Sequence, residues 1–316
     1  MAKTNGAKKI MKKKVRDARI VTREVAASMA ADAVLVPYFA ELFAGLDALG
    51  SMPLRVSNVI AKVAEKVVRG EDGAVARVLD LGGGKGAVAV ELARRFGCAV
   101  EMVDACPAFV EHANALAQRR GLEKLVMARV GDIEVEAKKL ARQVSRQVDR
   151  QVSGGKGAYD AAIMLNVWNF ERAAPTLRRL VKPGGVYVMD DAVLSVRLDV
   201  VRAFDSEVGD EVEEYAWEFA DVPTRDDVAK LIAAQGDHVL AEVVVPQRAL
   251  KVTHTKVLQV VTRNGKALAR REPKLKKAID ALLTRQREAG DVLLGPLQPV
   301  LWVVQRSSGR GSGRVG

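Results

Sequence analysis

Short apolar runs alternate with amphipathic stretches along most of this 316-residue chain. The runs that have the length and composition of buried strands lie at 77–81, 99–103, 126–130, 159–165 and 185–190. Between them, apolar residues recur with helical spacing at 86–96, 107–120, 137–152 and 172–181. Strands that alternate with helices in this way predict a parallel sheet wound on both faces.

The regions on either side of this alternation add helices and two further strands. Residues 20–69 have a helical pattern, which Pro37 interrupts. Towards the other end, strands are expected at 238–245 and 299–304, and helices at 199–220, 224–235 and 273–288. We therefore predict an α/β fold with a doubly wound, mostly parallel seven-stranded sheet and helical additions at both ends.

No linker divides the chain into two globular halves, so one main domain is expected. We place it at 71–304, after a helical cap at 19–70. Helices at about 199–235 and 273–290 would form a lid on it. Residues 1–18 and 305–316 have the composition of a disordered arm and tail.

The net charge of +11 lies almost entirely at the two ends of the chain. Residues 1–19 carry +7 and residues 305–316 carry +3, which leaves the body nearly neutral. Within the body, Arg142, Arg146 and Arg150 form a basic stripe at helical spacing. We favour an amphipathic surface helix here over an RNA contact, because charge runs are more often solvated faces.

Cysteine usage and hydropathy indicate a cytoplasmic protein without a membrane span. Cys98 and Cys106 are too few for a disulfide scaffold and are expected to be reduced packing residues. No apolar run approaches the ~18 residues of a membrane span, and the N-terminus lacks the apolar segment of a signal peptide. No His, Cys or acidic cluster has metal-ligand spacing, so no metal is expected.

The most informative stretch is "VLDLGGGKG" at 78–86, where a strand runs into a glycine-rich turn. A P-loop is excluded, because Lys85 is followed by Gly86 and Ala87 and not by a hydroxyl residue. Two patterns remain: the dinucleotide spacing G-x-G-x-x-A and the spacing D-x-G-x-G-x-G, which begins at Asp80. An acid at this place repels a pyrophosphate but favours the ammonium and sulfonium of S-adenosylmethionine.

Polar residues also end the next three strands. Asp104 is placed to accept hydrogen bonds from ribose hydroxyls, which NAD and S-adenosylmethionine share. Asp132 follows the third strand and can accept from an adenine amino group, with the Ile133 backbone beside the ring. Asn166 ends the fourth strand at the carboxyl edge, where open α/β sheets bind ligands.

The ordered motifs "VLDLGGGKG", "VEMVDA", "VGDI", "YDAAIMLNVW" and "LVKPGGVYVMDD" resemble those of class I S-adenosylmethionine-dependent methyltransferases. The resemblance covers residues 56–191 directly and implies a Rossmann-like fold with S-adenosyl-L-methionine as cofactor. More loosely, "LVPYFAELFAGLDALGS" and "EPKLKKAIDALLTRQREAG" resemble a microbial branch with helices over the pocket. The chain lacks N-P-P-Y after the fourth strand, which argues against adenine- and glutamine-directed N-methyltransferases.

The resemblance implies a role for each matching residue. The backbone of Gly82, Gly83, Gly84 and Gly86 would cradle the methionine part, with Asp80 fixing the turn. Asp104 would hold the ribose, and Ala105, Asp132 and Ile133 would surround the adenine. Asn166 would lie near the methyl donor. The alternative for Asp80 and Asp132 is capping of a turn or helix.

The candidate catalytic residues are Asp190 and Asp191, which follow the fifth strand and offer a general base, although either acid would also suit a strand end. The aromatic residues expected around the acceptor are Tyr38, Phe43, Trp168, Tyr215 and Trp217. Acids and aromatic rings at 205–222 would suit a cationic acceptor such as an amine, although acids on such a helix more often face water. His112 is expected on the outer surface, and His254 in or near a late strand.

The predicted function is methyl transfer from S-adenosylmethionine to a small molecule. One alternative keeps the chemistry but makes RNA the acceptor, through the basic arm and the arginine stripe. A second is an NAD-dependent oxidoreductase, which is disfavoured because no hydride-transfer pair is legible. A third is a binding protein that has lost catalysis. The methylated atom and the oligomeric state are left open.

Overall fold

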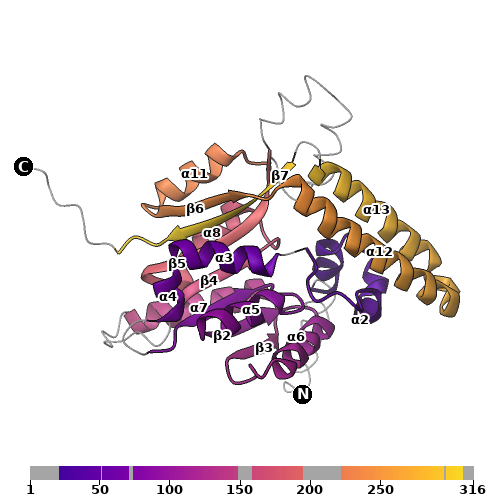
Figure 1. Cartoon of the computed structure of the whole chain (residues 1–316), viewed down its shortest axis with the longest axis horizontal. Coiled ribbons are helices and arrows are strands. Elements are labelled where there is room, and N and C mark those ends of the chain that lie inside the picture. The colour runs from indigo at the N-terminus through magenta and orange to yellow at the C-terminus, as the bar shows by residue number, and fades with distance from the viewer. Residues whose placement is uncertain are drawn as a thin grey trace, which may run out of the picture.

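The computed structural model describes residues 21–50, 52–70, 74–148, 159–194, 222–294 and 297–308. Its centre is a seven-stranded sheet with the order β3-β2-β1-β4-β5-β7-β6 (Figure 1). The strands are β1 (Arg77–Leu81), β2 (Ala99–Asp104), β3 (Val126–Val130), β4 (Tyr159–Leu165), β5 (Val181–Leu194), β6 (His238–Val244) and β7 (Leu297–Gln305). The expected strands are therefore all present, and β5 is longer at both ends.

The strands β1 to β5 pair in parallel, whereas β7 runs antiparallel between β5 and β6. This confirms the predicted doubly wound, mostly parallel sheet. The strand order reverses at β1, which pairs with β2 on one side and β4 on the other. Ligands of open α/β sheets bind at such a switch point, outside the carboxyl ends of the strands.

Helices cover both faces of the sheet and bury two hydrophobic cores. One face carries α3 (Pro53–Val63), α4 (Glu65–Arg69), α5 (Ala87–Phe96) and α6 (Pro107–Arg119). The other carries α7 (Ile133–Val148), α8 (Phe170–Leu180) and α11 (Arg225–Ala234). Side chains of β5 alternate between the two cores, with Val186 and Val188 facing α3 and with Tyr187 and Met189 facing α8.

A third core lies beside the sheet, where the N-terminal segment meets a long helical hairpin (Figure 1). The segment consists of η1 (Ala33–Tyr38) and α2 (Phe39–Leu42), and the hairpin of α12 (Gln247–Arg271), η2 (Pro273–Leu275) and α13 (Lys276–Leu294). The sequence pattern did not reveal α12, although it has 25 residues. Its buried residues form a narrow stripe on an otherwise polar helix, which weakens the periodic signal.

His254 lies within α12 and not near a strand, so that expectation was wrong. Its Nε2 is 2.7 Å from the Gln286 carbonyl oxygen on α13. A Cβ added to Gly290 would lie 2.1 Å from its ring, so the missing side chain at Gly290 makes room for the imidazole. His254 therefore joins the two helices of the hairpin.

Several expected boundaries change. The helix α7 begins at Ile133 and not at 137, because the Asp132 side chain accepts a hydrogen bond from Val135 N and caps it. Pro37 lies inside η1, so the break in the first helical stretch comes earlier. The helix α11 packs in the core under the sheet and is not part of a lid. The expected helix 199–220 of that lid lies entirely outside the described residues.

The chain after residue 304 also differs from expectation, because its first three residues belong to the fold. Gln305 ends β7, and Arg306 Nη1 donates to the Val181 carbonyl at 2.6 Å. Ser307 N donates to Asp237 Oδ1 at 2.9 Å. The structure does not describe the side chains of the remaining tail, of the N-terminal arm, or of Arg146 and Arg150.

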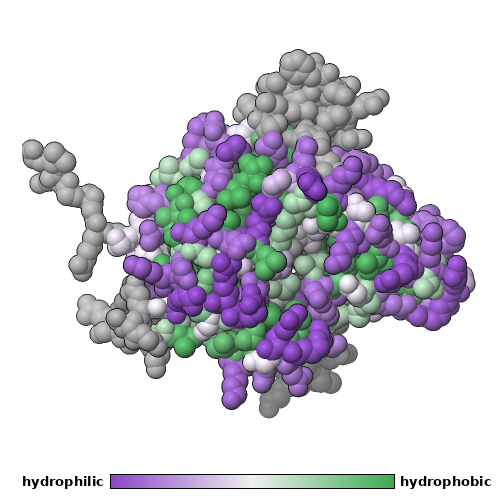
Figure 2. Space-filling view, in the orientation of Figure 1, coloured by the Kyte–Doolittle hydropathy of each residue, from purple (hydrophilic) through white to green (hydrophobic). Residues whose placement is uncertain are grey.

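The surface mixes hydrophilic and hydrophobic residues, and the far end of the α12–α13 hairpin is mainly hydrophilic (Figure 2). No single described helix is long and apolar enough to cross a membrane; the bent pair Val21–Ser28 and Ala33–Leu42 passes that test only when combined. Leu35, Phe39 and Leu42 of this pair are buried in the third core.

Candidate functional site

The glycine turn after β1 lies at the switch point and leads into α5. Gly82, Gly84 and Gly86 have φ values of 78°, 55° and 81°, which side-chain-bearing residues rarely adopt. A Cβ on Gly82 would lie 2.3 Å from Val167 Cγ2, and one on Gly83 would lie 2.6 Å from Met102 Cγ. Both the conformation and the packing therefore require glycine in this turn.

Asp104, at the end of β2, is bonded to the glycine turn. Its Oδ2 accepts from Gly84 N and its Oδ1 accepts from Cys106 N, both at 2.8 Å. Burial raises the pKa of this carboxyl, while the backbone N–H groups oppose the rise. Asp104 thus fixes the turn against the start of α6.

Asp80 is a buried acid without a partner for one of its oxygens. The residue is 2% exposed, and its Oδ2 has no hydrogen bond. The same oxygen lies 2.7 Å from the Cβ position on Gly83, which places it directly against the turn. Burial, and secondarily the charge of Asp104, raises its pKa to about 7. A cationic ligand on the turn would supply the missing interaction.

The ends of β3 and β4 reach the same turn. Ile133 Cδ1 lies 3.3 Å from the Cβ position on Gly82, next to Val167. Asp132 is half-buried and caps α7 through Val135 N at 3.0 Å, which is the alternative role considered for it. Asn166 is exposed, has a positive φ of 53°, and donates from its N to the Asp190 carbonyl at 2.8 Å. Ala105 is half-buried at the end of β2.

Asp190 and Asp191 point to opposite faces of the sheet, because successive side chains of a strand alternate. Asp190 continues the series of Val186 and Val188 and therefore lies on the α3 face. Asp191 lies on the α8 face, where its Oδ1 accepts from Ala192 N at 2.8 Å. The two candidate bases therefore lie on opposite faces of the sheet, and a site on one face has only one of them beside it.

Of the two, Asp190 is the one with unused hydrogen-bonding capacity at a buried atom. Its Oδ1 is buried and unpartnered. Burial and the charge of Asp191 raise its pKa to about 7, while Arg55 on α3 acts in the opposite direction. Burial likewise raises the pKa of Asp191 to about 7.

Arg55 is a candidate site residue that the sequence pattern did not predict. Its Nε is buried without a partner, although the side chain is only half-buried. An arginine on an amphipathic helix looks like a solvated residue in the sequence, so no signal pointed to it. The helix α3 packs against β7 and β6, which brings Arg55 close enough for its charge to lower the pKa of Asp190.

The aromatic residues expected around the acceptor have different surroundings. Phe43 is fully buried in the third core, 5.3 Å from Phe39 between ring centroids, so it does not line a pocket. Tyr38 packs half-buried on the same core. Trp168 is half-buried, with the Arg172 guanidinium 3.8 Å from its ring. Tyr215 and Trp217 lie outside the described residues.

His112 was expected on the outer surface, but it lies beside the glycine turn. Its Nδ1 lies 3.1 Å from the Lys85 carbonyl oxygen and its Nε2 lies 3.4 Å from Asp47 Oδ1.

Cys98 and Cys106 are buried and unpaired to each other. Among the described residues, no group of His, Cys, Asp and Glu is arranged to hold a metal ion.

Residues 52–236 match the family described as the methyltransferase domain. Among solved structures, YjhP from E. coli has a TM-score of 0.61 at 14% identity, covering 85% of this chain and 98% of that chain. S-adenosylmethionine-dependent methyltransferases from Thiobacillus denitrificans and Geobacter sulfurreducens, both in complex with S-adenosyl-L-homocysteine, each have a TM-score of 0.57. They are 18% and 16% identical, and the matches cover 84% and 85% of this chain and 96% of each of theirs. No curated protein sequence matches the chain.

Proposed function

Because the chain belongs to the methyltransferase-domain family, as a class I S-adenosylmethionine-dependent enzyme, we propose that it methylates a small molecule bound beside Asp190 and Arg55. The cofactor supplies an electrophilic methyl group when it is bound. The protein's task is then to orient the acceptor, exclude water and receive a proton.

The observation that carries the cofactor placement is the unpartnered Oδ2 of Asp80, which lies against the glycine turn. The backbone of Gly82–Gly86 would hold the amino acid part of the cofactor there, with its positive charges near Asp80. Asp104 would bind the ribose with its remaining lone pairs. Ala105, Asp132 and Ile133 would lie along the adenine. A pyrophosphate at this turn would instead face a buried acid, which disfavours NAD.

The acceptor site is proposed on the α3 face, at the carboxyl edge of β4 and β5. Asn166 N is bonded to the Asp190 carbonyl, so the Asp190 side chain begins where β4 ends. The buried Oδ1 of Asp190 would accept the proton that an O–H or N–H acceptor releases. Its pKa of about 7 suits a general base at neutral pH, because both protonation states are then accessible.

Arg55 supports this site in two ways. Its positive charge lowers the pKa of Asp190 and so favours the ionised form that can take a proton. Its unpartnered Nε can donate a hydrogen bond to an oxygen of the acceptor. The acceptor class proposed is therefore a small polar molecule that offers both a hydrogen-bond acceptor and a transferable proton.

The cofactor is tested by calorimetric titration with S-adenosyl-L-homocysteine and NAD in parallel. We expect binding of the first and no binding of the second. The reverse result would overturn the cofactor placement. Unlabelled amines, hydroxy acids and phenols are then offered with methyl-labelled S-adenosylmethionine, and total RNA is offered separately. Amines are included because residues 205–222 combine acids with aromatic rings.

The base is tested with Asp190→Asn on whichever small molecule is methylated. We expect kcat to fall by about 10²–10⁴, with cofactor affinity unchanged, because proton transfer contributes about that much. Asp191→Asn, on the opposite face, is the matched control and should keep its turnover. Methylation of RNA alone, or loss of turnover in Asp191→Asn instead, would contradict the proposal.

A further inference from the structure

Lys85 lies in the middle of the glycine turn, yet its side chain turns away from it into the N-terminal segment. The residue is only 6% exposed. Its Nζ donates to the Phe43 carbonyl at 3.0 Å and also to the Leu46 carbonyl. Burial lowers the pKa of this ammonium, while Asp47 opposes that change. Burying an ammonium is costly, so its carbonyl partners matter for keeping it there.

The same end of α2 is held from its other side by the hairpin. Asn264 Nδ2 on α12 donates to the Leu42 carbonyl at 3.1 Å and to the Ala44 carbonyl at 3.0 Å. The Arg271 guanidinium makes two hydrogen bonds to Glu41, at 2.9 Å and 2.6 Å. The carbonyls of the last residue of α2 and of the residues just after it are thus divided between Lys85 and Asn264.

The chain beyond this anchored point crosses the glycine turn. Leu49 Cδ1 lies 3.7 Å from the Cβ position on Gly84, which is ordinary contact distance. Between the two, Asp47 reaches His112, whose other ring nitrogen lies against the Lys85 carbonyl. Residues 43–49 therefore form a wall beside the turn, and Lys85 fixes the start of that wall.

We propose that Lys85 is a positioning residue for cofactor binding, which holds residues 43–49 as a wall over the end of the site that receives the amino acid part of the cofactor. The inference rests on the cofactor placement proposed above. Lys85 acts through the wall and its own ammonium does not touch the cofactor, because carbonyl oxygens occupy it. If Lys85 no longer holds the wall, ligands that carry the amino acid part should therefore bind more weakly. Ligands that lack this part should keep their affinity.

Two ligands that differ in this part provide the test. S-adenosyl-L-homocysteine carries the amino acid group, and 5′-methylthioadenosine lacks it. In Lys85→Met, which keeps the apolar stem and removes the donors, we expect the Kd of the first to rise at least about tenfold. The Kd of methylthioadenosine should change less than about threefold. Hydrogen exchange of residues 43–49 should become faster in the same variant. Lys124→Met, at an exposed lysine, is the matched control and should change neither affinity.

Equal weakening of both ligands, or no weakening of either, would overturn the inference, because a merely structural lysine does not discriminate between them. Leu49→Ala leaves the hydrogen bonds of Lys85 in place and removes the side chain nearest the turn. It therefore tests the wall if Lys85→Met fails to fold. It should also weaken S-adenosyl-L-homocysteine selectively. If the unaltered protein binds neither ligand, the cofactor placement fails. If it binds both and Lys85→Met matches it, this inference alone fails.

Discussion

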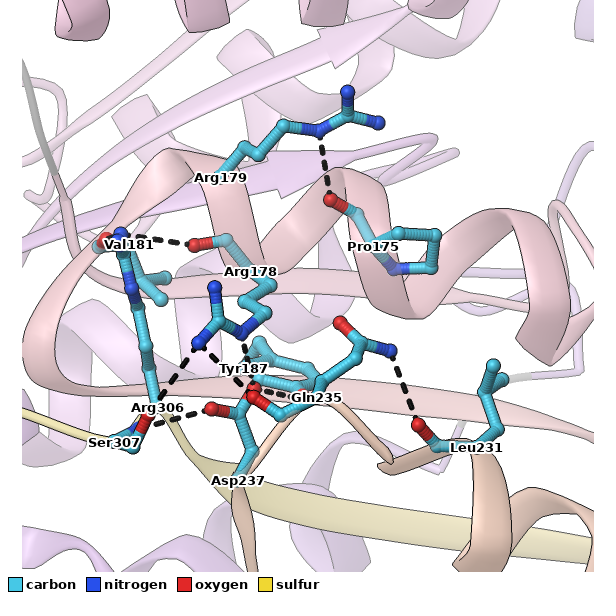
Figure 3. Close-up of polar contacts among 10 residues, drawn as sticks. All are labelled: Pro175, Arg178, Arg179, Val181, Tyr187, Leu231, Gln235, Asp237, Arg306 and Ser307. Atoms are coloured by element: carbon cyan, nitrogen blue, oxygen red, sulfur yellow. Dashed lines mark hydrogen bonds and ion pairs between the residues drawn. The ribbon is translucent and has the colours of Figure 1, made fainter. Parts of the chain in front are cut away.

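Two aspartates, Asp237 at the amino ends of the strands and Asp190 at the carboxyl ends, have opposite surroundings. Asp237 has both oxygens occupied (Figure 3): Oδ2 accepts from Arg178 Nε at 2.8 Å and from Tyr187 Oη at 2.9 Å, and Oδ1 accepts from Ser307 N. Asp190 Oδ1 is buried with no partner at all. Asp80 repeats the second situation at the same end of the sheet.

The difference separates an acid that holds the fold together from one that we propose to meet a ligand. Around Asp237, the end of α8, the start of β6 and the end of β7 meet on one carboxylate (Figure 3). At the other end, burial without partners raises the pKa of Asp80 and of Asp190 to about 7. Such groups cost free energy in the ligand-free protein, and they persist where function needs them.

The largest expected effect comes from the two glycines that mark these ends. Gly84 and Gly184 both have a positive φ, of 55° and 79°. Gly84→Val should weaken S-adenosyl-L-homocysteine binding by more than about 100-fold, since the branched side chain occupies the approach to the turn. Gly184→Val imposes similar backbone strain with nothing within 4 Å of its Cβ position, and should leave binding intact. Calorimetric titration checks both; equal losses would mean that strain alone decides.

Asp237→Asn should destabilise the protein by about 2–3 kcal/mol. The Asn side chain carries no charge, so the positive charge of the Arg178 guanidinium is left without its partner. Cofactor affinity should not change, since Asp237 lies at the opposite end of the sheet. Denaturant unfolding measures the first and titration the second. Asp280→Asn, in the exposed pair with Lys276, should cost less than about 1 kcal/mol. If Asp237→Asn leaves the free energy of unfolding unchanged, the contrast between the two ends of the sheet is wrong.

Asp190→Asn should have the opposite sign and the smallest size, with a gain of about 1 kcal/mol at pH 8, because the buried amide of the new Asn also lacks a partner and offsets most of the relief. The folded-state pKa of about 7 lies above the ordinary 3.8, so the folded protein holds this proton more tightly than the unfolded chain. Its contribution is therefore unfavourable at high pH and disappears as the pH falls towards 4. Unfolding curves of both proteins at pH 8 and pH 4 test this. A variant that is less stable at pH 8 would show that Asp190 has a structural partner.

The sequence alone determined the core of the fold. Each strand of the main sheet is a short apolar run and each covering helix an amphipathic stretch, and both signals are local. The glycine turn and the acids at the strand ends were also readable, because their chemistry depends on residues a few positions apart. The family assignment made from those motifs is confirmed.

Only the tertiary structure decided what depends on distant contacts. Whether Asp190 or Asp191 faces α3 depends on the strand's register in the sheet, which adjacent positions in a sequence do not specify. Arg55 and Lys85 carry no sequence signal, because each gains its partner across a long stretch of chain. The helix α12 was missed because its apolar stripe is narrow. Phe43 was expected around the acceptor but lies in a core. An aromatic side chain packs equally well in a core or around a ligand, so the sequence does not distinguish the two places.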